Sequence, residues 1–132
     1  MQVETGSFTA GGNAFDPAAL DRHDDAQLDE LPFGVIGLDG RGTILRYNLA
    51  EARLARLDRS RVVGKNFFRE VAPCTATPEF QGRFDAFVAG GERRIAFAYV
   101  FDFKFGAQEV EVELVRGARC TWLCINRLKF RP

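Results

Sequence analysis

The run from Arg94 to Phe105 constrains the fold of this chain more than any other stretch. Each odd-numbered position in the run carries a large apolar side chain: Ile95, Phe97, Tyr99, Phe101, Phe103 and Phe105. Successive side chains of a strand point to opposite faces of a sheet. The pattern therefore predicts a strand over 94–105 with one almost wholly aromatic face.

A second alternating run follows at 108–114. It directs valine and leucine side chains inward and three glutamates outward, namely Glu109, Glu111 and Glu113. A turn at 117–119 then leads into a last strand, predicted over 120–130. The chain therefore ends in a three-stranded antiparallel meander.

The first two thirds of the chain combine one hairpin with several short helices. Strands are predicted over 33–38 and 43–47, joined by the turn Asp39-Gly40-Arg41-Gly42. Helical segments or turns are predicted over 17–22, from Asp24 or Asp25 to Leu28, over 48–57, near 60–63, over 67–70 and over 78–89. This order predicts an α+β fold, a central antiparallel sheet with short helices on one face. We expect 1–30 to form an arm and cap, loosely held over 1–14, and 31–132 to form one compact unit.

Composition and charge argue against several classes of function. The 18 basic and 18 acidic residues give a net charge of zero, so neither nucleic acid nor an anionic membrane is expected as a partner. The sequence has no apolar stretch of about 20 residues and no signal sequence, so we expect a cytoplasmic protein. The 13 phenylalanines can build a tight core or line a cavity.

Three residues carry groups that could hold a small molecule between them. Tyr47 and Glu51 lie four residues apart, a spacing that puts two side chains on one face of a helix. Cys74 follows in a Pro-containing loop. On the residues alone, such a Tyr–Glu pair is more often solvated surface, and a single cysteine is more often a small buried hydrophobe.

The remaining cysteines and the histidine suggest no other chemistry. Cys120 and Cys124 are predicted to lie in the core, because their spacing suits neither a zinc site nor a redox pair. His23 is the only histidine and lies in the N-terminal part, so neither a Cys–His couple nor a metal site is expected.

Several short segments form a distinctive combination: Asp25-x-Gln27-Leu28-Asp29, Phe33-Gly34-x-Ile36-x-Leu38-Asp39-Gly40, Tyr47-Asn48-x-Ala50-Glu51, Val63-Gly64-Lys65-Asn66-Phe67-Phe68, Val71-Ala72-Pro73-Cys74-Thr75, Pro78-Glu79-Phe80 and Tyr99-x-Phe101-Asp102. With them, the chain from about residue 15 resembles the photoactive yellow protein family, bacterial blue-light receptors of the PAS fold. The resemblance implies a five-stranded antiparallel sheet, short helices on one face, an N-terminal helical cap and a PAS-type sensor domain over 31–132.

The resemblance also implies a cofactor and its site. The family's p-coumaric acid (4-hydroxycinnamic acid) would be thioester-linked to Cys74, and its phenolate would accept hydrogen bonds from Tyr47 and a protonated Glu51. The implied lining residues are Ile36, Phe67, Ala72, Pro73, Thr75, Phe101, Phe103 and Phe105. Signalling would proceed by trans–cis isomerisation, proton transfer and partial unfolding of the N-terminal segment. We expect a monomer, not an enzyme, that acts on a downstream signalling protein.

The surroundings of the implied site depart from the family pattern. Ala55 replaces a threonine, Leu57 replaces an arginine, and Phe103 and Phe105 replace a tyrosine and a methionine. Two other functions stay open on sequence grounds. One is a PAS module that binds a different ligand or acts only in protein contacts. The other is an enzyme, which the sequence disfavours because no general base accompanies the thiol.

Overall fold

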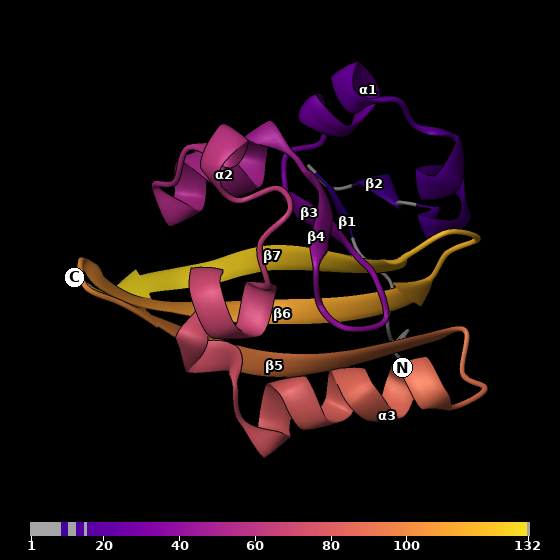
Figure 1. The fold of residues 1–132 in the computed structure, drawn as a ribbon. Coiled ribbons are helices and arrows are strands. Elements are labelled where there is room, and N and C mark those ends of the chain that lie inside the picture. Colours follow the sequence, from indigo (N-terminus) through magenta and orange to yellow (C-terminus); the bar gives the residue numbers. More distant parts are fainter. Residues whose placement is uncertain (1–8, 11–12, 15, 132) are drawn as a thin grey trace.

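The sheet at the centre of the molecule contains five antiparallel strands. The computed structural model describes residues 9–10, 13–14 and 16–131. The strands are β3 (Gly34–Leu38), β4 (Ile44–Tyr47), β5 (Arg94–Phe103), β6 (Gly106–Arg116) and β7 (Thr121–Arg131). Their spatial order is β4-β3-β7-β6-β5, so the β3–β4 hairpin joins the C-terminal meander through β7 (Figure 1). The predicted α+β class and five-stranded sheet are confirmed.

The meander is longer and more regular than its sequence pattern indicates. β5 and β6 pair from Arg94↔Val115 to Phe103↔Gly106. β6 and β7 pair from Arg116↔Thr121 to Ala107↔Arg131, with one irregularity next to Val110. The predicted strand end at Phe105 is wrong, because the chain turns after Phe103. Gly106 has a φ of 143°, which a side chain disfavours, and this lets the turn close over two residues.

Eight short helical segments connect the strands in the described part of the chain; the turn at 73–75 lies where the sequence predicts a loop, and the predicted helix over 78–89 is divided into two segments. They are η1 (Pro17–Arg22), α1 (Asp25–Asp29), α2 (Leu49–Ala55), η2 (Arg59–Arg61), η3 (Phe67–Val71), η4 (Pro73–Thr75), η5 (Pro78–Gly82) and α3 (Arg83–Ala89). Side-chain caps fix the starts of several of them: Asp24 accepts from the Gln27 amide, Asn48 from that of Glu51, and Thr77 from that of Phe80.

The larger core lies between the sheet and the segment from α2 to α3. The ring of Phe80 is at its centre, within 6.1 Å, centroid to centroid, of five other aromatic rings: Phe67, Phe68, Phe97, Tyr99 and Phe101. The aromatic face of β5 thus packs against the apolar stripe that begins at Phe80.

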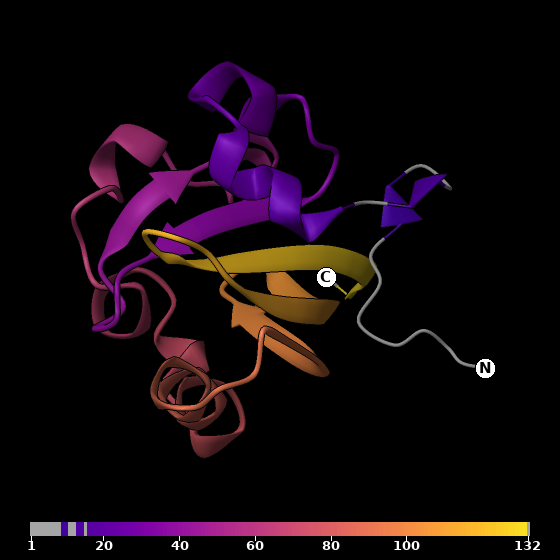
Figure 2. The same ribbon diagram turned by 90° about the vertical axis from the view of Figure 1, so that its right-hand side faces the viewer.

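A smaller core lies on the opposite face of the sheet, beneath η1 and α1 (Figure 2). It comprises Leu20, Leu28, Phe33, Val35, Val115, Trp122 and Cys124. Asp21 ties this cap to the sheet, because its carboxylate accepts hydrogen bonds from the Trp122 indole at 2.9 Å and the Ala118 amide at 3.0 Å.

The sequence predicts that Glu113 of β6 points outward into solvent. This prediction is wrong, because the smaller core covers that face of the sheet. Glu113 does face away from the helices, but it is fully buried rather than solvated. One carboxylate oxygen pairs with Arg94, and the other, Oε1, has no hydrogen-bond partner among the described residues. The alternation along β6 correctly predicted on which face of the sheet Glu113 lies. It did not predict that the N-terminal segment covers that face.

The predicted loose arm over 1–14 lies largely outside the described residues. Within it, β1 (Thr9–Ala10) pairs antiparallel with β2 (Asn13–Ala14) as a separate two-stranded sheet. Across the residues that the structure describes, no helix is both long and apolar enough to cross a membrane.

Candidate functional site

Tyr47 and Glu51 come together at the junction of β4 and α2. Tyr47 ends β4, Asn48 caps α2, and Glu51 lies in the first helical turn. The two residues are therefore not on one helix, but both are buried, with 6% and 2% of their surface exposed. The Asn48 side chain fixes the junction, because its amide donates to the Leu28 and Phe33 carbonyls and its oxygen accepts from the Val35 and Glu51 amides.

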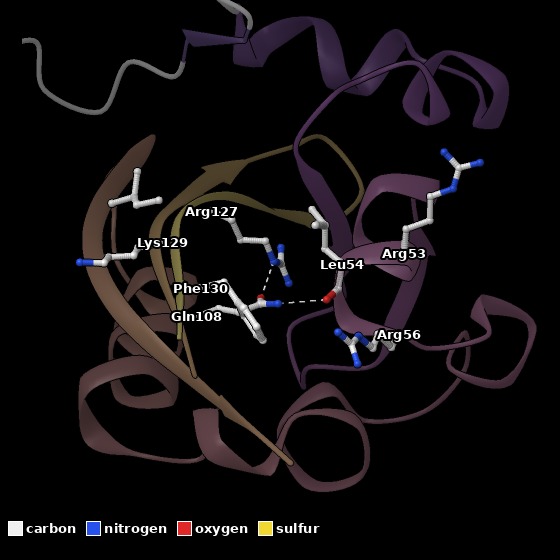
Figure 3. A pocket seen from close by; sticks show the side chains of 8 residues that line it. Arg53, Leu54, Arg56, Gln108, Arg127, Lys129 and Phe130 are labelled. Atoms are coloured by element: carbon white, nitrogen blue, oxygen red, sulfur yellow. Dashed lines mark hydrogen bonds between the residues drawn. The ribbon is translucent and has the colours of Figure 1, made fainter. Parts of the chain in front are cut away.

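The Glu51 carboxylate forms a buried ion pair with Arg127 of β7. The two guanidinium Nη groups donate to its two oxygens at 2.7 and 3.0 Å. Arg127 Nε donates to Gln108 Oε1 at 2.5 Å, and Gln108 Nε2 donates to the Leu54 carbonyl at 3.1 Å. This chain of bonds joins Glu51 to β6 and the last turn of α2; Figure 3 shows its part from Arg127 through Gln108 to Leu54.

A glycine makes room for this carboxylate. A Cβ at Gly34 would lie 2.1 Å from Glu51 Oε1 and 3.3 Å from Arg127 Nη1. Position 34 therefore cannot carry a side chain without displacing the ion pair.

Burial governs the protonation of both side chains. Burial raises the pKa of Glu51, and the Arg127 guanidinium opposes that rise. Burial also raises the pKa of Tyr47, with the Glu51 charge adding to the effect, so Tyr47 stays a phenol. The Tyr47 hydroxyl has no hydrogen-bond partner in the described part of the chain. It is therefore a donor available to an acceptor, on a side chain that is 6% exposed.

Cys74 sits in the single turn η4 between Pro73 and Thr75. The Thr75 hydroxyl donates to the Ala72 carbonyl at 2.6 Å, and the Tyr99 hydroxyl donates to the Cys74 carbonyl at 2.5 Å. These bonds fix the turn against β5. The thiol is half-buried and packs against the larger core. Burial raises its pKa, while a hydrogen bond from the Asp102 backbone favours the thiolate.

The other two cysteines lie on the opposite side of the sheet, with the smaller core. Cys124 is buried, and burial raises its pKa, as does the nearby Glu113 charge. Burial raises the pKa of Cys120 to about 11. Neither faces the aromatic face of β5.

Most of the lining residues implied by the resemblance share one cluster. Ile36, Tyr47, Phe67, Ala72 and Phe101 are buried members of the larger core, and Cys74 and Phe103 pack against it. Thr75 is fully buried in its turn.

Two of the implied lining residues lie elsewhere. Pro73 is exposed. Phe105 lies in the β5–β6 turn, where its ring stacks on Phe103 at 5.0 Å and on Phe130 at 5.9 Å. The guanidinium of Arg56 covers Phe105 at 4.0 Å.

Arg127 and Gln108 are site residues that the sequence reasoning missed. A signal existed, because both lie on inward positions next to the apolar residues of their strands. A buried arginine needs a partner for its charge, and here the partner, Glu51, is 76 residues away in the chain.

Comparison with known proteins agrees with this architecture. The PAS fold family model matches residues 22–126. The photoactive yellow protein of Rhodothalassium salexigens is 45% identical over 106 residues, covering 79% of this chain and 85% of the relative. That of Halochromatium salexigens is 42% identical over the same shares of both chains.

A solved structure gives the same result. The photoactive yellow protein domain of the sensor histidine kinase Ppr from Rhodospirillum centenum is 39% identical and superposes with a TM-score of 0.77. The match covers 82% of this chain and 96% of that one. The five-stranded fold, the buried Tyr47–Glu51 junction and these relatives together establish that the chain belongs to the photoactive yellow protein family of PAS-fold proteins.

Proposed function

We propose that the protein is a blue-light receptor whose chromophore, p-coumaric acid, is thioester-linked to Cys74. The observation that carries the proposal is the buried pair of hydrogen-bonding groups, Tyr47 and Glu51, in the aromatic core against which the Cys74 thiol packs. Family membership supports a sensor rather than an enzyme. We further propose that it acts as a cytoplasmic monomer on a downstream signalling protein.

The chemistry of the side chains suits such a group. A buried phenolate requires hydrogen-bond donors, and a phenol and a neutral carboxyl group can both donate. The Tyr47 hydroxyl has no hydrogen-bond partner within the described ranges, and burial favours the neutral form of Glu51. When bound, p-coumaric acid supplies light absorption, trans–cis isomerisation and a phenolate oxygen that can take up a proton.

Cys74 provides the attachment point. Its sulfur must be a thiolate to attack an activated ester. Because burial raises the pKa of this thiol, attachment should quicken as the pH rises above neutral. Tyr99 holds the Cys74 carbonyl and so keeps the turn in place while the sulfur is acylated.

Glu51 provides the proton. As a carboxylic acid it donates a hydrogen bond in the dark, and after illumination it gives up that proton. The carboxylate that remains then has a cation at hand, because both Arg127 Nη groups lie within 3.0 Å of its oxygens. Asn48 links the Glu51 amide to the carbonyl of Leu28 in the cap, which offers a route from the buried acid to the N-terminal segment.

Reconstitution tests this function. Purified apoprotein is mixed with an activated p-coumaroyl ester, and intact mass and visible absorption are recorded. We expect the mass of one p-coumaroyl group and a visible band that blue light bleaches reversibly. Cys74→Ala should abolish both, while Cys120→Ala and Cys124→Ala, as matched controls, should retain them. No added mass, or a chromophore recovered on a peptide with Cys120, would overturn the proposal and favour a PAS module with another ligand or none.

A further inference from the structure

A cavity of about 410 Å³ lies directly outside the Glu51–Arg127 ion pair. Residues of α2, β6 and β7 line it: Arg53, Leu54, Arg56, Gln108, Arg127, Leu128, Lys129 and Phe130. Four of these eight residues are cationic and none is acidic. The chain as a whole has zero net charge, so this is a local concentration of positive charge.

Two of the four cations, the nearly buried Arg127 and the exposed Arg56, point into the cavity. Arg127 and Arg56 project toward its middle from opposite sides, whereas Arg53 and Lys129 extend away from it (Figure 3). The side chain of Arg127 is only 10% exposed, and its described ion-pair partner is Glu51. Arg56 lies over the Phe105 ring and forms no ion pair with any described residue.

Protonation of Glu51 changes the charge balance at this site. A guanidinium stays charged at any physiological pH, so Arg127 cannot follow Glu51 by losing its own proton. Once Glu51 is neutral, a nine-tenths-buried cation faces a cavity with no acidic side chain. A buried charge without a counter-ion is strongly unfavourable.

We propose that this cavity is a binding site for a small monovalent anion, held between Arg127 and Arg56, that fills when Glu51 is protonated. The anion accepts hydrogen bonds from the Arg127 Nη groups that Glu51 releases, and Gln108 continues to hold Arg127 Nε. Proton uptake at Glu51 and anion uptake at Arg127 are therefore coupled, each favouring the other.

The charged groups around Glu51 support this coupling. Tyr47 of β4 stays a phenol, Gln108 of β6 is neutral, and the remaining charged lining groups are cations of α2 and β7. The inference builds on the neutral Glu51 of the proposed function, but it does not require the chromophore.

Chloride NMR line broadening on apoprotein tests the site, with chloride itself as the probe. In Glu51→Gln, which copies the neutral acid, we expect chloride to bind at least about tenfold more tightly than in the parent at about pH 8. Adding Arg127→Gln to that variant should abolish the excess broadening, and adding Arg56→Gln should reduce it. Arg53→Gln and Lys129→Gln are the matched controls, because they remove rim cations of the same cavity, and both should retain it.

A second measurement covers the case in which Glu51→Gln folds poorly. In the parent apoprotein, the excess broadening should grow as the pH is lowered within the range in which the protein stays folded, and it should be lost in Arg127→Gln. Equal broadening in the parent and Glu51→Gln would overturn the proposal, as would broadening that the Arg53 control removes as strongly as Arg127→Gln. Because apoprotein is used, either result leaves the Cys74 assignment untouched.

Discussion

At the scale of single residues, the ion pair between Glu51 and Arg127 decides how the site behaves. Both side chains are at least nine-tenths buried, and their geometry is bidentate. Such pairs contribute little relative to apolar replacements, but removal of one partner leaves a buried charge without compensation. Burial and Arg127 act on the Glu51 pKa in opposite directions, so the protonation of Glu51 can respond to a change in its surroundings.

Arg127→Met should therefore destabilise the apoprotein in a pH-dependent way. Without the guanidinium, the pKa of Glu51 rises further, so the folded state binds a proton that the unfolded state releases. Stability then falls as the pH rises above the carboxyl's unfolded value, and at about pH 8 the loss should be roughly 3–5 kcal/mol. Urea unfolding of the variant at several pH values measures it.

The double variant Glu51→Gln/Arg127→Met should recover most of that stability, because it carries no buried charge at this position. Arg53→Met is the control for loss of a cation from α2. A loss in Arg127→Met that is the same at about pH 5 and about pH 8 would show that Arg127 acts by packing rather than by charge.

At the scale of elements, the β5–β6 turn is held by an aromatic stack. The Phe103 and Phe105 rings are almost parallel, with 4° between their planes, and Phe130 of β7 extends the stack. Arg56, which caps the end of α2, lies with its guanidinium over the Phe105 ring. The turn is thus linked to both α2 and the last strand.

Phe105→Met should speed the return of the reconstituted protein to its dark state. Methionine is flexible where phenylalanine is rigid, and the change removes the stacking and cation–π contacts that hold the turn. If roughly 1 kcal/mol of that restraint lies on the recovery path, the rate should rise about fivefold. Flash photolysis measures it, with Phe103→Tyr as the matched change that keeps a ring. If the variant recovers as slowly as the parent, the contacts of the β5–β6 turn do not limit the rate of dark recovery.

At the scale of the whole molecule, two cores share one sheet. The site occupies the core beneath α2 and α3, while the N-terminal cap covers the other face. Glu113 lies beneath that cap, with one oxygen that no residue in the described ranges pairs with, and burial raises the pKa of its carboxyl to about 7. The N-terminal cap therefore covers a carboxyl group whose pKa is near neutral.

Glu113 should make the molecule less stable as the pH rises from about 4.5 to about 7. In that window the Glu113 carboxyl keeps its proton in the folded state but has lost it in the unfolded state. The free energy of unfolding therefore falls as the pH rises, by about 3 kcal/mol at most over the whole window. Glu113→Gln should flatten the slope and raise the melting temperature at higher pH. Glu109→Gln removes a partly exposed glutamate on the same strand and face, one that pairs with Arg131, and should leave the slope unchanged. An unaltered slope in Glu113→Gln would show that its carboxyl does not titrate there.

Local sequence signals predicted most of the fold but only part of the site. Alternation and turn residues located the hairpin and the meander, and cap residues such as Asn48 and Thr77 located the helix starts. The pairing of Arg127 with Glu51 depends on how distant strands come together, so no local pattern reveals it. The burial of Glu113 depends likewise on the cap, and the placement of Phe105 on where the strand turns.

The infrared difference spectrum between light and dark states of the reconstituted protein tests the central claim most directly. If Glu51 is the buried neutral acid, illumination should remove a protonated-carboxyl band and produce a carboxylate band, and Glu51→Gln should lack both signals. Glu113→Gln should retain them, which separates the two buried acids. A wild-type spectrum that loses no protonated-carboxyl signal, or a loss that persists in Glu51→Gln, would contradict the account.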